Sequence, residues 1–138
     1  MLRYAVVALA LSGCVQLPVT PADTQAKRFE SVPNKAVVYV VRQPMDSVEP
    51  GGLALENGEQ ISTLPGTYYR WEMSPGAHRL VGMPPASASL SFTVEPGKIY
   101  YLRHTVIGQW RDGPQLASLI PIGTDEGQAL VTRSELIR

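Results

Sequence analysis

Four turn-forming dipeptides in the middle of the chain limit its fold more than any other sequence feature. They are Asn57-Gly58, Pro65-Gly66, Pro75-Gly76 and Pro96-Gly97. Proline presets φ for the first central position of a turn, and glycine adopts positive φ without steric cost, so each pair favours a tight reversal. Asn57-Gly58 predicts a type I′ hairpin turn with positive φ at both residues, and Pro75-Gly76 predicts a type II turn. Turns this close together fit many short strands.

The segments around these turns are rich in β-branched and aromatic residues, which predicts seven or eight short strands. The segments are 35–42, 53–56, 60–64, 67–73, 78–81, 88–94, 99–107 and 115–122. The first, KAVVYVVR, is apolar on both faces, which is typical of a central strand covered on both sides. In 67–73, alternation separates two faces, one with Tyr69, Trp71 and Met73 and the other with Tyr68, Arg70 and Glu72.

The tail from Asp125 has a different pattern. Its apolar residues recur at roughly helical spacing: Ala129, Leu130, Leu136 and Ile137. Thr124 or Asp125 can cap a helix that starts there, so we expect a short C-terminal helix. With no helices between the strands, the predicted fold class is all-β: an antiparallel β-sandwich, immunoglobulin-like or prealbumin-like.

The first 14 residues have the layout of an export signal. Arg3 supplies a positive charge, residues 5–11 form an unbroken apolar run, and Ser12 and Gly13 are small. Cys14, the only cysteine, follows directly. A membrane-spanning helix needs about 20 apolar residues, and this apolar run is much shorter. The order apolar, small, small, cysteine resembles the lipobox of bacterial lipoproteins.

The lipobox resemblance implies that the Cys14 thiol receives a diacylglyceryl group and that the chain is cut just before it. The new amine is then acylated, and Cys14 anchors the protein in a membrane. We therefore expect a signal peptide at 1–13, a lipidated cysteine with a flexible tether at 14–34, and the β-sandwich domain at 35–138. Phe29 and Val32 in the tether can alternatively dock onto the domain. In a Gram-negative bacterium, Val15 after the cysteine resembles cargo that is sorted to the outer membrane, facing the periplasm.

Composition argues against a nucleic-acid partner and against a disulfide within the chain. The sequence has 12 basic and 12 acidic residues, and loss of Arg3 leaves the mature chain near −1. This balance offers no basic patch for nucleic acid. A single cysteine excludes a disulfide within the chain, so burial and backbone pairing must stabilise the domain.

Five segments in order carry a resemblance to a known family. They are KAVVYVVRQP, GLALENGEQISTL, Gly-Thr-Tyr-Tyr, Ser-Pro-Gly-Ala-His and Glu-Pro-Gly-Lys-Ile-Tyr-Tyr-Leu. From about Lys35 to about Ile107, the chain resembles the bacterial lipoproteins of the domain of unknown function 2846 family. The Pro-Gly turns before strands are also similar to β-sandwich repeats of the PEGA type. The resemblance implies a secreted, tethered β-sandwich and supplies no catalytic residues.

No constellation of residues indicates catalysis or metal binding. His78 and His104 have no second ligand at a recognisable spacing, so we interpret both as strand residues that make an ordinary hydrogen bond. No serine lies in a G-x-S-x-G motif. We therefore expect no catalytic residues, no metal and no cofactor.

Three residues are candidates for contact with a partner. Tyr68 and Arg70 lie on a strand face where an exposed aromatic strip can stack on sugars or anchor a protein. Trp110 lies in the polar loop 108–113, and loops often carry function. The alternatives are that the tyrosines cover a sheet face or contact the tether and the C-terminal helix, and that Trp110 packs against the domain edge.

The sequence thus predicts a non-enzymatic envelope lipoprotein. The lipid at Cys14 holds a β-sandwich at the membrane, where the domain binds a protein or cell-wall partner or packs into a larger assembly. The alternatives are an envelope hydrolase and a protein that binds a small ligand or a sugar.

Overall fold

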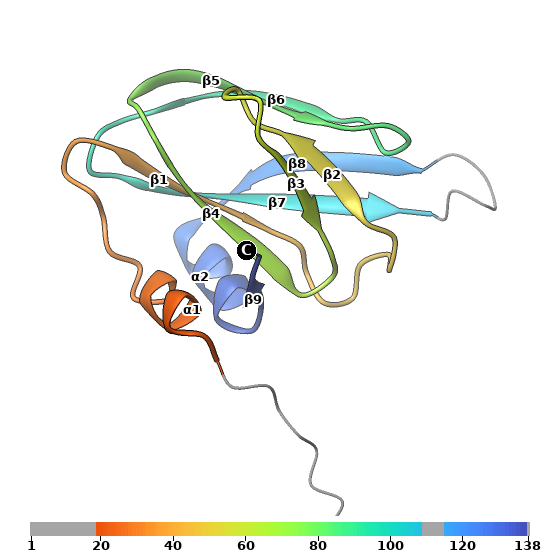
Figure 1. The fold of residues 1–138 in the computed structure, drawn as a ribbon, viewed down its shortest axis with the longest axis horizontal. Coiled ribbons are helices and arrows are strands. Elements are labelled where there is room, and N and C mark those ends of the chain that lie inside the picture. The colour runs from red at the N-terminus through yellow and green to blue at the C-terminus, as the bar shows by residue number, and fades with distance from the viewer. Residues whose placement is uncertain (1–18, 109–114, 138) are drawn as a thin grey trace, which may run out of the picture.

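The computed structural model describes residues 19–108 and 115–137, which form nine strands and two helices (Figure 1). The helices are α1 (Pro21–Ala26) and α2 (Thr124–Thr132). The strands are β1 (Ala36–Val41), β2 (Gly51–Ala54), β3 (Gln60–Thr63), β4 (Thr67–Met73), β5 (Gly76–Gly82), β6 (Ser89–Val94), β7 (Ile99–Ile107), β8 (Leu116–Ile122) and β9 (Glu135–Leu136). The predicted all-β class is confirmed. Each predicted strand is present, and β9 is an additional one.

The strands form two sheets that face each other. The five-stranded sheet has the order β8-β7-β1-β4-β9 and the four-stranded sheet has the order β3-β2-β5-β6. Apolar side chains from both sheets pack between them, including Val38 and Trp71 from the first and Leu53 and Leu80 from the second. Figure 1 shows both helices below the five-stranded sheet, on the side away from the four-stranded sheet. The fold is therefore sandwich-like, with a helical layer outside.

Strand β1 lies at the centre of this arrangement, as its apolar sequence predicts. All six of its residues are fully buried. Val38 and Val40 face the core between the sheets. Val37, Tyr39 and Val41 face a second apolar cluster that includes residues of both helices. The prediction of a central strand that is covered on both faces is confirmed.

The prediction of a purely antiparallel sandwich is wrong for two strand pairs. β1 runs parallel to β7, and β4 runs parallel to β9. Parallel neighbours require a long connection, and five strands lie between β1 and β7 in the chain. A hydrophobic pattern reports which faces are buried but does not report the direction of a neighbouring strand.

The hairpin at Asn57-Gly58 forms, but its turn differs from the predicted type I′. Gly58 has φ of 83°, whereas Asn57 does not have positive φ. Leu55 N donates to Glu59 O at 2.8 Å, and Gly58 N donates to Leu55 O at 3.0 Å. This pattern fits a three-residue loop, in which a type I turn is followed by a glycine bulge. At Pro75-Gly76, Gly76 has φ of 125° where the chain crosses from β4 in one sheet to β5 in the other.

The C-terminal helix is confirmed, but it is shorter than its apolar spacing indicates. The helix α2 begins after Gly123, which occupies the N-cap position in place of the predicted Thr124 or Asp125. Leu136 lies in β9, and Ile137 N donates to Tyr68 O at 2.8 Å. The chain leaves the helix because the edge of β4 offers backbone partners to residues after 134.

The folded domain starts earlier than the predicted boundary at Lys35. Residues of the predicted tether form α1, and Ala26 is buried. The ring of Phe29 lies 5.7 Å from the ring of Tyr39, and Val32 packs against the same cluster. The boundary at Lys35 is therefore corrected to a start no later than α1, because the outer face of β1 needs an apolar cover. Neither helix in the described ranges has the length and apolar character needed to span a bilayer.

The packing of α2 on the sheet depends on a glycine. A Cβ added at Gly127 would lie 2.2 Å from Tyr101 Cγ. Alanine in a helix interior is ordinarily more favourable than glycine by about 1 kcal/mol. Here the clash dominates, so we expect Gly127→Ala to lower the free energy of unfolding by about 1–3 kcal/mol in urea denaturation.

Gly123→Ala is the matched control for this test. Nothing lies within 4 Å of a Cβ added there, and we expect alanine at this N-cap position to cost less than about 1 kcal/mol. Equal losses of stability in the two variants would contradict the close packing of α2 on Tyr101.

Candidate functional site

Helix α1 is held on the sheet by the buried carboxylate of Asp23. Thr20 caps the helix by accepting from Asp23 N at 3.2 Å, and Pro21 starts the first turn. The Asp23 Oδ1 atom accepts from Tyr68 OH at 2.8 Å and from Leu136 N at 3.0 Å. The Asp23 Oδ2 atom lies 2.7 Å from Lys27 Nζ. One carboxylate therefore joins α1 to β4 and β9.

The electrostatics of this contact favour charged Asp23. Burial alone would raise the pKa of Asp23, but the hydrogen bonds from Lys27 and Tyr68 outweigh it and lower the pKa below its ordinary 3.8. Burial and the bond to Asp23 raise the pKa of Tyr68 far above its ordinary value. Tyr68 therefore remains a proton donor to a charged acceptor.

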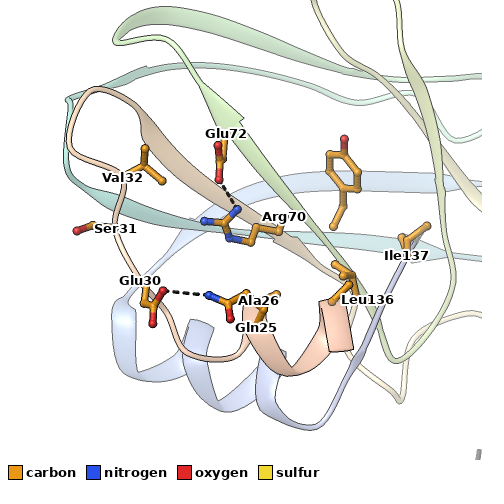
Figure 2. A pocket seen from close by; sticks show the side chains of 11 residues that line it. Gln25, Ala26, Glu30, Ser31, Val32, Arg70, Glu72, Leu136 and Ile137 are labelled. Atoms are coloured by element: carbon orange, nitrogen blue, oxygen red, sulfur yellow. Dashed lines mark hydrogen bonds and ion pairs between the residues drawn. The ribbon is translucent and has the colours of Figure 1, made fainter. Parts of the chain in front are cut away.

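A groove of about 470 Å³ lies beside this contact. Its walls come from α1, residues 30–32, β4 and the C-terminal end (Figure 2). Arg70 projects into the groove from β4, and its Nη1 lies 2.6 Å from Glu72 Oε1. Across from it, Gln25 Nε2 donates to Glu30 Oε2 at 3.0 Å. The groove combines these polar pairs with apolar walls.

The structure separates the residues that the sequence proposed for partner contact. Arg70 is half-buried in the groove and is accessible from it. Tyr68 is fully buried, so its prediction as an exposed contact is wrong. The alternative, that this tyrosine contacts the tether, is correct, because the Tyr68 hydroxyl donates to Asp23 in α1, within the predicted tether. Trp110 and Cys14 lie outside the described residues.

The other aromatic residues on this face also cover the sheet. Tyr39 and Tyr101 stack with their ring centroids 5.3 Å apart, and Phe29 lies 6.3 Å from Tyr101. Tyr39 OH donates to Ala26 O at 2.6 Å. These rings fill the space under the helices, and they do not form an exposed strip.

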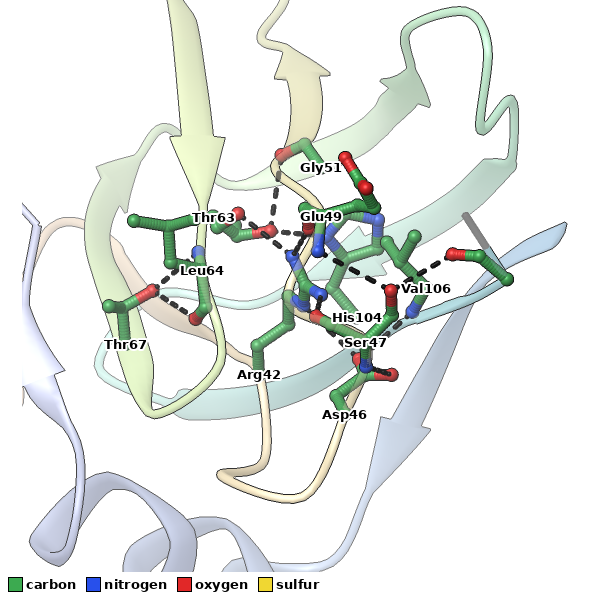
Figure 3. Close-up of polar contacts among 11 residues, drawn as sticks. Arg42, Asp46, Ser47, Glu49, Gly51, Thr63, Leu64, Thr67, His104 and Val106 are labelled. Carbon is green, nitrogen blue, oxygen red and sulfur yellow. Dashed lines mark hydrogen bonds and ion pairs between the residues drawn. The ribbon is translucent and has the colours of Figure 1, made fainter. Parts of the chain in front are cut away.

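A second polar cluster is buried at the other end of β1 (Figure 3). The guanidinium of Arg42 is fully buried and donates to Asp46 Oδ2 at 3.1 Å and to Thr63 O at 2.9 Å. It also donates to the carbonyl oxygens of Ser47 and Glu49. Arg42 thus organises the loop after β1 around its fork of donors.

His104 belongs to the same cluster. Thr63 Oγ1 donates to Gly51 O at 3.1 Å, so the His104 Nδ1–H, 2.9 Å away, donates to Thr63 Oγ1. The other ring nitrogen, Nε2, is buried and has no hydrogen-bond partner among the described residues. Burial, and then the charge of Arg42, lower the pKa of His104 to about 4. His104 is therefore a neutral core residue at neutral pH.

His78 lies far from this cluster in a polar contact near the surface. Its Nδ1 lies 2.7 Å from Glu56 Oε2, and its Nε2 lies 2.6 Å from Ser74 O. Both ring nitrogens thus face acceptor oxygens, and the second is a backbone carbonyl. This arrangement gives the imidazole no hydroxyl nucleophile to activate. In the part of the chain that the structure describes, no group of three His, Cys, Asp or Glu side chains is placed to hold a metal ion.

Comparison with known protein families finds no matching family, and comparison with curated proteins finds no matching protein.

The His104 environment predicts a specific loss of stability in mild acid. An unfolded His104 binds a proton near pH 6.5, whereas the folded one resists protonation until about pH 4. The contribution of neutral His104 is therefore present above pH 6.5 and is lost as the pH falls to about 4. We expect this to cost the domain on the order of 3 kcal/mol, measured by urea denaturation across this range.

His104→Asn should remove this part of the pH dependence, since the amide cannot titrate. His78→Asn is the matched control and should retain it. If the slope follows His78 and not His104, the assignment of His104 as the buried neutral histidine is wrong.

Loss of the Asp23 carboxylate should release α1. Asp23→Ala leaves Tyr68 OH without its acceptor, so we expect the free energy of unfolding to fall by about 2–4 kcal/mol. The amides of Thr24 and Lys27, which are bonded within α1, should exchange faster with deuterium. Asp125→Ala, at an exposed position in the first turn of α2, should leave this exchange unchanged and lower the free energy of unfolding by less than about 1 kcal/mol. Unchanged exchange in Asp23→Ala would show that other contacts hold the helix.

Proposed function

We propose that this chain is a bacterial envelope lipoprotein, anchored through a lipid on Cys14, whose sandwich-like domain binds a partner at the membrane without catalysing a reaction. The observation that carries the proposal is the order of the first 14 residues: a basic residue, an unbroken apolar run, two small residues and the only cysteine. One acyl chain binds a membrane weakly, whereas two or three give stable anchoring.

The position of α1 supports a role close to the membrane surface. Helix α1 begins at Pro21, seven residues after Cys14. A fully extended chain of that length spans at most about 25 Å. A lipid on Cys14 would therefore hold the domain next to the bilayer and raise its effective concentration for membrane partners.

The finer type of the fold and its family are part of this proposal. Two facing sheets with a central Val-rich strand are compatible with an immunoglobulin-like or prealbumin-like sandwich. The motifs from about Lys35 to about Ile107 support membership of the domain of unknown function 2846 family. In a Gram-negative cell, Val15 after the cysteine favours sorting of the protein to the outer membrane, with the domain facing the periplasm.

Two observations support binding over catalysis. His104 is buried in a structural cluster, and His78 faces a carboxylate and a backbone carbonyl. The groove beside Arg70, in contrast, is open to solvent and is built from several segments of the chain. A binding module needs such a surface and no reactive group.

A small-ligand or sugar-binding role is the second candidate. The volume of the groove, about 470 Å³, lies within the range of small-molecule sites, about 300–1,000 Å³. The polar side chains of the groove are paired with each other, however, as Arg70 is with Glu72. They would have to exchange partners to bind a ligand, so we place this role second.

The anchor is tested by Cys14→Ser in a bacterial host. This change removes the thiol that would carry the lipid, so we expect the variant to lose membrane association or to remain unprocessed. Membrane fractionation with immunoblotting measures both. Ser12→Ala, which keeps a small residue before the cysteine, is the control and should behave as the unmodified chain. A Cys14→Ser variant that is processed and retained in the membrane normally would contradict the proposal.

A further inference from the structure

The outer edge of β4 is only partly covered. β9 pairs with β4 at Tyr68 and the residue before it, and the last hydrogen bond joins Ile137 N to Tyr68 O at 2.8 Å. β4 continues to Met73. Among the described residues, 69–73 therefore have β1 on one side and no strand on the other.

The register identifies which backbone groups face this open side. Arg42 N donates to Thr67 O at 3.0 Å, so Thr67 faces β1. Tyr68 O faces β9. Because successive residues of a strand alternate, the N–H and C=O groups of Arg70 and Glu72 face the same side as those of Tyr68. In the described ranges, none of these four groups has a hydrogen-bond partner.

The groove follows this open edge. Tyr69, which packs towards the core between the sheets, and Arg70 and Glu72, on the opposite face of β4, all line it. The groove therefore includes the backbone between the two faces. Figure 2 shows Leu136 and Ile137 at the end of the groove where β9 stops, and Glu30 and Val32 on the opposite wall.

We propose that the β4 edge binds an extended peptide segment of a partner protein by strand addition, with the partner backbone paired to Arg70 and Glu72. Two donors and two acceptors, repeated at a spacing of about 7 Å, are complementary to another strand. The inference rests on the proposed binding role and names its class of partner. It does not depend on the lipid anchor.

The charges of the groove restrict the sequence of the partner. Arg70 is the positive side chain in its lining, and Glu30 and Glu72 are the negative ones. This balance of one net negative charge favours a neutral or basic segment over an acidic one. Leu136, Ile137 and Val32 provide apolar walls for its side chains.

Selection of peptides tests this proposal directly. The probe is a library of random linear peptides displayed on phage, selected against the purified full chain. Hydrogen exchange then compares the amides of Arg70 and Glu72 with and without a selected peptide. We expect both amides to exchange rapidly in the free protein and to become protected by the peptide.

Two variants at one position separate the backbone from the side chain. Glu72→Pro removes an N–H on the open edge and leaves the β1–β4 hydrogen bonds intact, a position where strands tolerate proline. Glu72→Ala removes the same carboxylate and keeps the N–H. We expect Glu72→Pro to weaken binding by about tenfold or more. Glu72→Ala should bind at least tenfold more tightly than Glu72→Pro, because both variants lack the carboxylate and only Glu72→Ala keeps the N–H on the open edge.

Each other outcome overturns the proposal. Selected peptides that protect another surface, or a selection that yields none, would show that the edge is not a peptide site. Equal binding by both variants would exclude backbone pairing. If Glu72→Pro does not fold, hydrogen exchange in the unmodified chain still tests the proposal: a peptide that leaves the Arg70 and Glu72 amides unprotected overturns it. Concentration-dependent protection without peptide would assign the edge to a second copy of this chain. The two proposals can fail separately. If the Cys14→Ser variant loses membrane association as expected but the peptide selection fails, the lipid anchor is supported and the peptide site is rejected.

Discussion

The complete burial of β1 is the constraint on which the rest of the structure depends. Four of its six residues are valines, and each fully buried valine stabilises the fold by roughly 1.5–3 kcal/mol. An apolar strand with two buried faces needs a cover on each. The four-stranded sheet covers one face, and α1, α2 and the residues after α1 cover the other. Residues 21–32 are therefore part of the fold, and Asp23 holds α1 on the sheet.

Local patterns in the sequence predict the strands well, because alternation and turn residues act over a few positions. Tyr69 and Tyr68 lie on opposite faces of β4, as the alternation in 67–73 predicts. Relations between distant segments are harder to predict. Nothing in the pattern of β7 indicates its parallel pairing with β1, and Leu136 and Ile137 fit a helical spacing although they extend along β4.

The same distinction applies to the candidate site. The sequence indicates Arg70 by its polar position on a strand face, and in the structure Arg70 lines the groove. The groove itself arises from segments more than a hundred residues apart, as the bond from Leu136 N to Asp23 shows. Tyr68 was misassigned because alternation identifies its face but not the helix that covers it. A proline-rich stretch such as 18–34 resembles a linker in composition, and the apolar residues Ala26, Phe29 and Val32 were the signal that it packs.

We propose that a lipid on Cys14 anchors this domain, and in that case the groove beside α1 would lie near the bilayer. The lipid anchor is most directly tested by mass spectrometry of the mature N-terminal peptide, isolated from bacterial membranes. We expect a chain that begins at Cys14 and carries acyl groups on that residue. A mature chain that retains residues 1–13, or that has an unmodified Cys14 thiol, would contradict it.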